Sequence, residues 1–136
     1  TIPVCVNTVQ APLPSASRCY RLGEAIGRAI ESWDTEERVV VIGTGGLSHQ
    51  LDGTRAGFIN MDFDRKFMAS LVDDPKWATQ YSPLDLVELA GTQGVEVLMW
   101  LVARGALTGK GRELHSNYHI PISNTASAVM LLENRG

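Results

Sequence analysis

The stretch VVVIGTGGLSHQLDG, from Val39 to Gly53, decides the fold class. With Arg38 it forms a predicted strand over residues 38–42, and its apolar, β-branched residues are typical of strands buried on both faces of a parallel sheet. The glycines that follow allow a sharp turn and a close approach to a bound group. Because α/β proteins bind ligands at the carboxyl ends of such strands, His49 is a candidate functional residue. The alternative is a histidine that only bonds a loop carbonyl where the strand ends.

The residues before this stretch complete a βαβ unit. Residues 2–9 are rich in β-branched residues and predict a first strand. Apolar residues from Cys19 to Trp33 recur at spacings of three and four behind a capping Ser15 or Ser17, which predicts a helix. We therefore expect residues 1–136 to form a single α/β domain, with a mostly parallel central sheet flanked by helices.

Beyond the glycine turn the pattern is mainly helical. Ser82, followed by a proline and an acidic residue, marks one helix start, and Gly91 marks its end. Gly105 is predicted to end the last helix as a left-handed cap. The predicted helices are 63–71 (ending near Pro75), 84–90 and 94–104, and two short strands are predicted at 118–122 and 128–132.

Composition limits the classes of function. The 136 residues carry a net charge of −3, which argues against a general nucleic-acid binder. No apolar stretch is long enough to predict a membrane span, and no signal peptide is apparent. Cys5 and Cys19 lack CxxC spacing, which favours reduced thiols and a cytoplasmic location. The chain opens at Thr1 inside strand-like sequence and without a methionine, as a fragment would.

The segment GTQGVEVLMWLVARG, from Gly91 to Gly105, contains an isolated carboxylate. From Val95 to Ala103 every residue except Glu96 is apolar, and a helix that is apolar on all sides is normally buried. Burying an unpaired carboxylate costs several kcal/mol, so such a group is usually paired, protonated or bound to a metal. Two alternatives remain for Glu96. It lies on an exposed seam of the helix, or its carboxylate pairs with Arg104 or another arginine.

The segment HSNYHIPISNTAS, from His115 to Ser127, is dense in hydrogen-bonding groups suited to a small polar ligand. The spacing of His115 and His119 would suit zinc on a helix, but Pro121 and its β-branched neighbours argue against a helix here. A polar loop with a solvent-facing His115 is the preferred interpretation. The residues alone therefore indicate an α/β domain with an acid–base histidine and a buried carboxylate as candidates.

Several separate blocks together resemble a known enzyme family. These blocks are RCYRLGEAIGRAIESWD, IGTGGLSHQLDG, GFINMDFDRKFM, ELAGTQGVEVLMWLVARGAL and NYHIPISNTA. In order and spacing they resemble the carboxyl-terminal half of catalytic β subunits of the protocatechuate 4,5-dioxygenase kind, and more widely the type III extradiol dioxygenases.

The resemblance implies an Fe(II) enzyme that opens a catechol-type aromatic acid, such as protocatechuate or gallate, beside the diol with O₂. It implies that Glu96 is the glutamate ligand of a two-histidine, one-carboxylate iron site. It also implies that His49 is the acid–base residue, near the iron but not bound to it. Ser123 and Asn124 match the segment that faces the substituent on the substrate ring.

The family's two iron-binding histidines lie in an amino-terminal half without a counterpart here, and neither His115 nor His119 matches them. The resemblance therefore implies a truncated longer protein, a partner chain that supplies the rest, or a remnant without activity. It also implies an oligomer, with no nucleic acid or membrane as partner. A non-catalytic subunit that binds a partner chain without iron, and an anion-binding α/β domain using the glycine turn, are the alternative functions.

Overall fold

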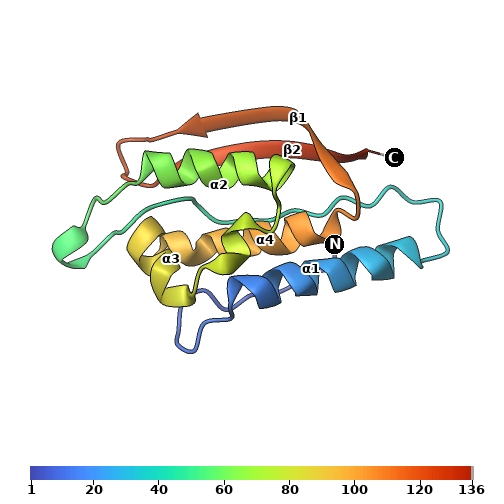
Figure 1. Cartoon of the computed structure of the whole chain (residues 1–136), viewed down its shortest axis with the longest axis horizontal. Coiled ribbons are helices and arrows are strands. Elements are labelled where there is room, and N and C mark those ends of the chain that lie inside the picture. Colours follow the sequence, from blue (N-terminus) through green and yellow to red (C-terminus); the bar gives the residue numbers. More distant parts are fainter. Residues whose placement is uncertain (136) are drawn as a thin grey trace.

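The computed structural model of the chain describes residues 1–135, and side chains as far as residue 134. Helices dominate the middle of the chain, and an antiparallel hairpin closes it (Figure 1). The class is therefore mixed α/β, as predicted. The α-helices are α1 (Ala16–Glu31), α2 (Met61–Asp73), α3 (Pro83–Ala90) and α4 (Val97–Ala106); the 3-10 turns are η1 (Gly53–Arg55), η2 (Trp77–Gln80) and η3 (Gly94–Glu96); the strands are β1 (Lys110–His119) and β2 (Ser127–Arg135).

Helix α1 begins at Ser15, one of the two predicted caps, whose side chain accepts from the Arg18 N–H. It packs closely along α4 because glycines line the contact: a Cβ on Gly23 would lie 2.1 Å from the Val102 oxygen. Gly105 was predicted as a left-handed cap, and this is wrong. It lies inside α4, where a Cβ would lie 2.3 Å from the Tyr20 oxygen. The glycine therefore allows the two helices to approach each other.

Helices α2, α3 and α4 enclose the core. The predicted start and end of α3 are confirmed: Ser82 and Asp85 form a capping box, and Gly91 ends the helix at a φ of +90°. Helix α4 is apolar on all sides, and most of its residues are buried, as expected for such a helix. The largest fully buried apolar side chains come from these helices, from η3 and from the glycine turn: Phe67, Leu86, Val95, Val97, Leu98, Leu101 and Leu47.

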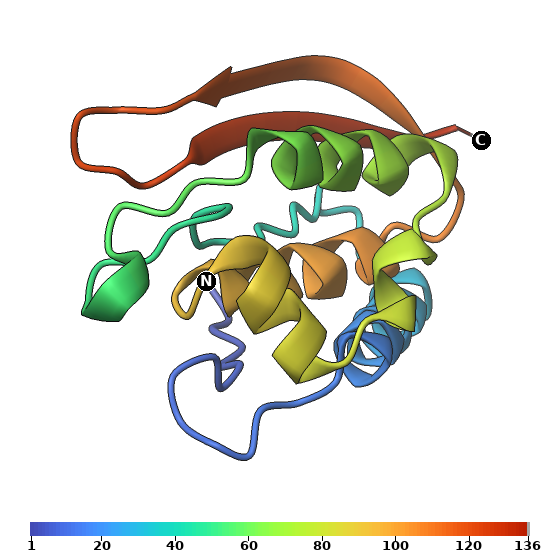
Figure 2. The same ribbon diagram turned by 60° about the vertical axis from the view of Figure 1, so that its left-hand side comes forward.

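The hairpin is longer than the two predicted strands. β1 and β2 pair in antiparallel register from Lys110 opposite Arg135 to His119 opposite Ser127, with an irregularity between Glu113 and His115. Pro121 and Ile122 lie in the connecting loop and not in a strand. The hairpin packs on α2, and α1 lies on the far side of α4 (Figure 2).

The mostly parallel central sheet is not formed by residues 1–135. Residues 2–9 and 38–42 belong to no strand, and the two-stranded hairpin is the sheet of the described chain. The physical reason is that a strand exists only when a second backbone accepts and donates its hydrogen bonds, and neither segment has such a partner here. Within the described range, no helix has both the length and the apolar character needed to cross a membrane.

Candidate active site

The glycine turn lies directly against α4. A Cβ on Gly45, where φ is +97°, would lie 2.7 Å from the Glu96 Cβ, and one on Gly43 would lie 2.9 Å from the Ala103 Cβ. The Trp100 indole N–H donates to the Gly45 carbonyl at 3.0 Å. Glu96 and Trp100 therefore lie on the same side of this helical segment, and that side contacts the glycine turn.

Glu96 is half-buried at the end of η3, one residue before α4 begins. Its Oε2 accepts a hydrogen bond of 2.6 Å from the backbone N–H of Gly46, fifty residues earlier in the chain. Its other oxygen, Oε1, makes no hydrogen bond with any described residue, and no arginine or lysine of the described part forms an ion pair with it. The carboxylate is thus oriented by one backbone donor and keeps an oxygen free for another group.

Arg104, the predicted alternative partner, is committed elsewhere. Its buried guanidinium donates to the carbonyls of Leu71, Leu107 and Gly109 and so ties the end of α4 to the chain around it. Burial lowers the pKa of this guanidinium from its ordinary value. The alternative in which Glu96 pairs with Arg104 is therefore wrong.

His49 is 5% exposed, and its ring lies beside the glycine turn. A Cβ on Gly46 would lie 3.1 Å from the imidazole Cε1, so a larger residue there would press on the ring. The imidazole Nδ1 lies 2.9 Å from the Leu47 carbonyl oxygen. Because a carbonyl can only accept, this contact assigns the proton of the neutral ring to Nδ1 and leaves the lone pair on Nε2. The carbonyl bond foreseen as an alternative thus exists, and it leaves Nε2 able to take a proton.

The backbone around His49 is fixed by the junction between α3 and η3. The His49 N–H donates to the Ala90 carbonyl at 2.8 Å, and its carbonyl accepts from the Gly94 N–H at 3.2 Å. Gly91 makes this approach possible, because a Cβ there would lie 2.2 Å from the His49 oxygen. One short segment about forty residues further along the chain therefore holds the histidine backbone in place.

A buried carboxylate supports the turn from the other side. Asp64 on α2 is fully buried and accepts from the Ser48 N–H (2.8 Å), the Ser48 hydroxyl (2.6 Å) and the Tyr118 hydroxyl (2.8 Å). The Ser48 oxygen in turn accepts from the Asn60 N–H at 2.8 Å. Burial raises the pKa of the Asp64 carboxyl, while the bonds from Ser48 and Tyr118 oppose the rise.

Sequence reasoning did not single out Asp64. A signal was present, because the aspartate lies beside Phe63 and four residues before Met68 on the apolar side of a predicted helix. A charged side chain on the apolar side of a helix needs a hydrogen-bond or ionic partner, which is the same argument that drew attention to Glu96.

The Tyr118 phenol is affected by the same carboxylate. Burial raises the pKa of the phenol, and its hydrogen bond to Asp64 adds to the rise.

The loop that carries Ser123 and Asn124 reaches the same turn. Ala126 exchanges backbone hydrogen bonds with the turn, accepting from the Leu47 N–H at 2.8 Å and donating to the Ser48 carbonyl at 3.2 Å. Ser123 and Asn124 are exposed, and Asn124 adopts a positive φ of 55°. The structure thus carries the loop of these two residues to the turn that holds His49.

Two other histidines stay outside this site. His115 and His119 are exposed on β1, which confirms the expectation of a solvent-facing His115. No group of three or more His, Cys, Asp or Glu side chains in the described part of the chain could hold a metal ion. The Glu96 oxygen without a hydrogen bond is one carboxylate ligand at most, so the described residues do not form a complete metal site.

The sequence matches known proteins over almost its full length. Residues 1–129 match the family described as the catalytic LigB subunit of aromatic ring-opening dioxygenase. The chain therefore belongs to this family.

Individual relatives are longer than this chain. It is 42% identical to gallate dioxygenase of Pseudomonas putida over 134 residues, which cover 98% of the chain and 39% of that protein. It is 28% identical to 2,3-dihydroxyphenylpropionate/2,3-dihydroxicinnamic acid 1,2-dioxygenase 1 of Pseudomonas putida, over 89% of the chain and 52% of that protein. The 2,3-dihydroxyphenylpropionate/2,3-dihydroxicinnamic acid 1,2-dioxygenase of Rhodococcus jostii is 49% identical over 49 residues, which cover 36% of the chain and 15% of that protein. The chain thus spans about two fifths to one half of the relatives that it matches over most of its length.

Proposed function

We propose that this chain is the part of a cytoplasmic, Fe(II)-dependent extradiol dioxygenase that supplies Glu96 and His49 to the active site. The substrate is a catechol-type aromatic acid of the gallate or protocatechuate kind, and the rest of the iron shell comes from a part of the subunit, or from a partner chain, outside these 136 residues. The observation that carries the proposal is the meeting of two distant groups at Gly46, which donates to the Glu96 carboxylate and lies against the His49 ring.

Each residue has a role that its contacts support. Glu96 would hold the iron through the oxygen that makes no hydrogen bond, while Gly46 fixes the other oxygen. Iron held there would supply Lewis-acid and redox chemistry toward the diol and O₂. The unprotonated Nε2 of His49 accepts a proton from a substrate hydroxyl and later donates it to an oxygen atom derived from O₂, while the Nδ1 proton stays on its hydrogen bond to the Leu47 carbonyl.

Ser123 and Asn124 are proposed to bind the carboxylate of the substrate. The Ser123 hydroxyl and the Asn124 amide are hydrogen-bond donors on an exposed loop, and Ala126 ties that loop to the turn beside His49. A mostly parallel central sheet and an oligomeric state are proposed for the complete subunit.

The test uses a chimera in which this chain replaces its 134-residue counterpart in the Pseudomonas putida gallate dioxygenase. The chimera should bind iron and cleave gallate, as followed by O₂ uptake and the ultraviolet spectrum. Glu96→Gln should remove most of the bound iron, since the neutral amide is a poor ligand for a hard cation. His49→Phe should retain iron and lose turnover by about 100-fold or more.

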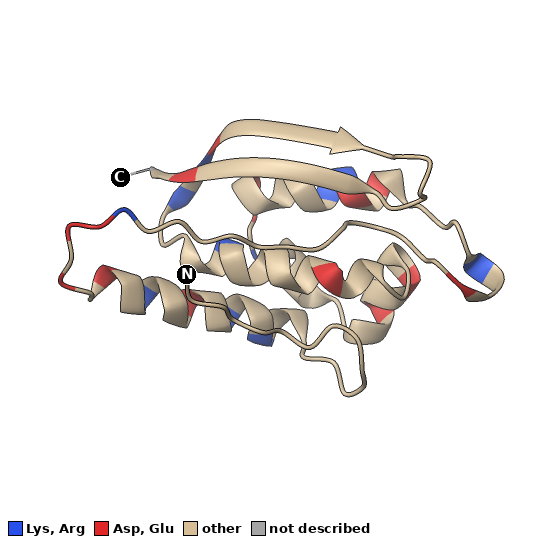
Figure 3. Cartoon of the chain, turned by 180° about the vertical axis from the view of Figure 1, so that it is seen from behind, with Lys and Arg blue, Asp and Glu red and all other residues tan. Residues whose placement is uncertain are grey.

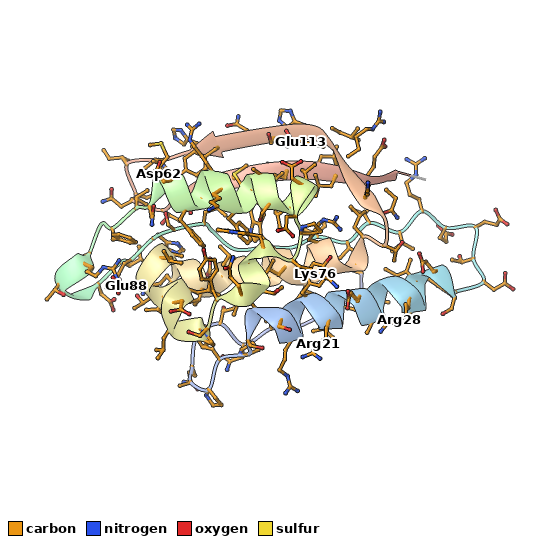
Figure 4. The ribbon with its side chains drawn as sticks, in the orientation of Figure 1. Arg21, Arg28, Asp62, Lys76, Glu88 and Glu113 are labelled. Atoms are coloured by element: carbon orange, nitrogen blue, oxygen red, sulfur yellow. The ribbon has the colours of Figure 1, made fainter. Side chains whose placement is uncertain are left out.

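Matched variants separate these roles from general damage. Glu88, labelled on α3 in Figure 4, is an exposed carboxylate. It pairs with Arg55, and Glu88→Gln should leave the iron content unchanged. His119 is exposed on β1, and His119→Phe should leave turnover unchanged. A chimera that binds no iron, or a His49→Phe variant with full ring cleavage, would contradict the proposal.

A further inference from the structure

Asp64 joins two parts of the candidate site that are far apart in the sequence. It is fully buried in the first turn of α2, and its Oδ2 accepts from two hydroxyls, that of Ser48 at 2.6 Å and that of Tyr118 at 2.8 Å. Ser48 directly precedes His49. Tyr118 lies near the end of β1, where the hairpin loop of residues 120–126 begins. One carboxylate oxygen therefore ties the turn before the histidine to the hairpin.

The hairpin loop is tied to the same turn at its other end. Ala126 exchanges two backbone hydrogen bonds with the turn, at 2.8 and 3.2 Å. Beside it, the Thr125 Cγ2 lies 3.1 Å from the position that a Cβ on Gly46 would take, and the His49 Cε1 lies at the same distance from that position. The loop is therefore held at one end by backbone bonds and at the other by the Tyr118 hydroxyl on the buried carboxylate.

Both ties are made at the beginning of α2. Seen from behind, the hairpin runs along α2, and its loop lies at the same end of the molecule as the start of this helix (Figure 3). Asn60 caps the helix there, since its side chain accepts from the Phe63 N–H at 3.1 Å. Its own N–H donates to the Ser48 hydroxyl at 2.8 Å, so this hydroxyl is bonded on two sides. The turn is thus fixed to the helix, and the helix offers the Asp64 carboxylate to the loop.

The tie through Tyr118 is the stronger kind of hydrogen bond. A hydroxyl that donates to a carboxylate makes a charge-assisted bond, which is roughly twice as strong as a bond between neutral groups. Ser123 and Asn124 are exposed, so burial of their own side chains does little to hold the loop in place. Without the Tyr118 hydroxyl, the tie between the loop and the turn would rest on the Ala126 backbone alone.

We propose that the hydrogen bond from Tyr118 to Asp64 preorganises the hairpin loop for substrate binding, which makes both of them positioning residues for ring cleavage. The inference rests on the proposed function, in which Ser123 and Asn124 bind the substrate carboxylate while His49 takes a proton from a substrate hydroxyl. A loop that is already in place costs the substrate no ordering when it binds, so its affinity is higher. Neither positioning residue has to touch the substrate for this effect.

Tyr118→Phe in the gallate dioxygenase chimera tests the proposal, because it removes the hydroxyl and keeps the packed ring. The KM for gallate at saturating O₂ should rise at least about 5-fold, while kcat and the iron content change by less than about 2-fold. An unchanged KM would overturn the proposal, including the case in which a general loss of structure lowers kcat and the iron content together.

Tyr81→Phe is the matched control. Tyr81 packs edge-on against the rings of Phe63 and Trp77, so this variant also removes a phenol oxygen from the aromatic cluster. It leaves the three hydrogen bonds to Asp64 intact, and neither KM nor kcat should change.

A double-mutant cycle shows whether Tyr118 acts through the loop. When Ser123 and Asn124 are both replaced by alanine, the loop can no longer bind the carboxylate, so adding Tyr118→Phe should change the KM by less than about 2-fold. An equal rise of KM in both backgrounds would contradict the inference, although the chimera still cleaves gallate.

Hydrogen exchange in the 136-residue chain gives a measurement that needs no catalysis. The amides of Leu47 and Ala126, which pair the turn with the loop, should exchange at least about 5-fold faster in Tyr118→Phe, whereas the amides of α4 should not change. Unchanged exchange at both amides would refute the inference. Faster exchange there in a chimera that cleaves no gallate would instead overturn the proposed function and leave the tie between loop and turn standing.

Discussion

Replacing Ser48 by alanine tests whether the turn before His49 depends on the buried Asp64 carboxylate. The variant removes the hydroxyl that donates to Asp64 at 2.6 Å, and it leaves the Asn60 N–H without its acceptor. A buried hydrogen bond to a charged group contributes about 1.5–3 kcal/mol, and an unsatisfied N–H costs about 1 kcal/mol or more. Ser48→Ala should therefore lower the free energy of unfolding by about 3 kcal/mol at neutral pH.

The assay is urea unfolding followed by tryptophan fluorescence and circular dichroism. With a slope of about 2 kcal/mol per molar urea, the midpoint should fall by about 1.5 M. The matched control is Ser116→Ala, because Ser116 is exposed and bonds only the exposed Glu113. That control should change stability by less than about 0.5 kcal/mol.

The effect of Ser48→Ala should also depend on pH. Burial raises the pKa of Asp64 in the folded state, so its contribution to stability is present below its ordinary pKa of 3.8 and is lost as the pH rises through the folded value. The bonds from Ser48 lower this pKa, and removing the hydroxyl should raise it further. The destabilisation should thus be larger at about pH 7 than at about pH 4. An effect no larger than that of Ser116→Ala, or one that shrinks as the pH rises, would refute the reasoning.

Two further predictions concern the contacts that hold the glycine turn and His49. Gly91→Ala should lower the free energy of unfolding by more than about 3 kcal/mol, because φ is +90° and the Cβ would lie 2.2 Å from the His49 oxygen. The control Gly53→Ala has a φ of +73° but its nearest contact is at 3.7 Å, so it should cost only about 1 kcal/mol when both are measured by thermal unfolding. Burial raises the pKa of Tyr118, so its contribution is present below the ordinary value of 10.0 and is lost as the pH rises through the raised value. Tyr118→Phe should therefore show a smaller loss of stability above about pH 10 than the natural chain, and an unchanged alkaline slope in urea titrations would contradict the assignment.

The sequence determined the helices because their signals are local. Periodic apolar residues and capping groups such as Ser15 and Ser82 act within a few residues, so the helices lie close to their predicted positions. Gly105 shows the limit of local signals. Only the packing of α1 against α4 shows that this glycine allows the two helices to lie close together and does not end α4 as a cap.

The sheet could not be predicted in the same way, because strand pairing requires a second backbone that the local sequence does not specify. Residues 38–42 were predicted as a strand from their valine-rich composition, but they form none, because the described chain holds no partner for them. The β1–β2 hairpin, by contrast, contains both of its strands and is formed.

For the candidate site, the sequence supplied Glu96 and His49, because an isolated carboxylate on an apolar helix and a histidine after a glycine turn are visible in the residues themselves. Their catalytic and metal-binding roles remain predictions. Tertiary structure alone decided that both groups meet at Gly46, that the Leu47 carbonyl sets the tautomer of the imidazole, and that a buried aspartate on α2 supports the turn. These contacts join residues that are up to fifty positions apart, and such distant contacts form only when the packed helices bring their backbones together.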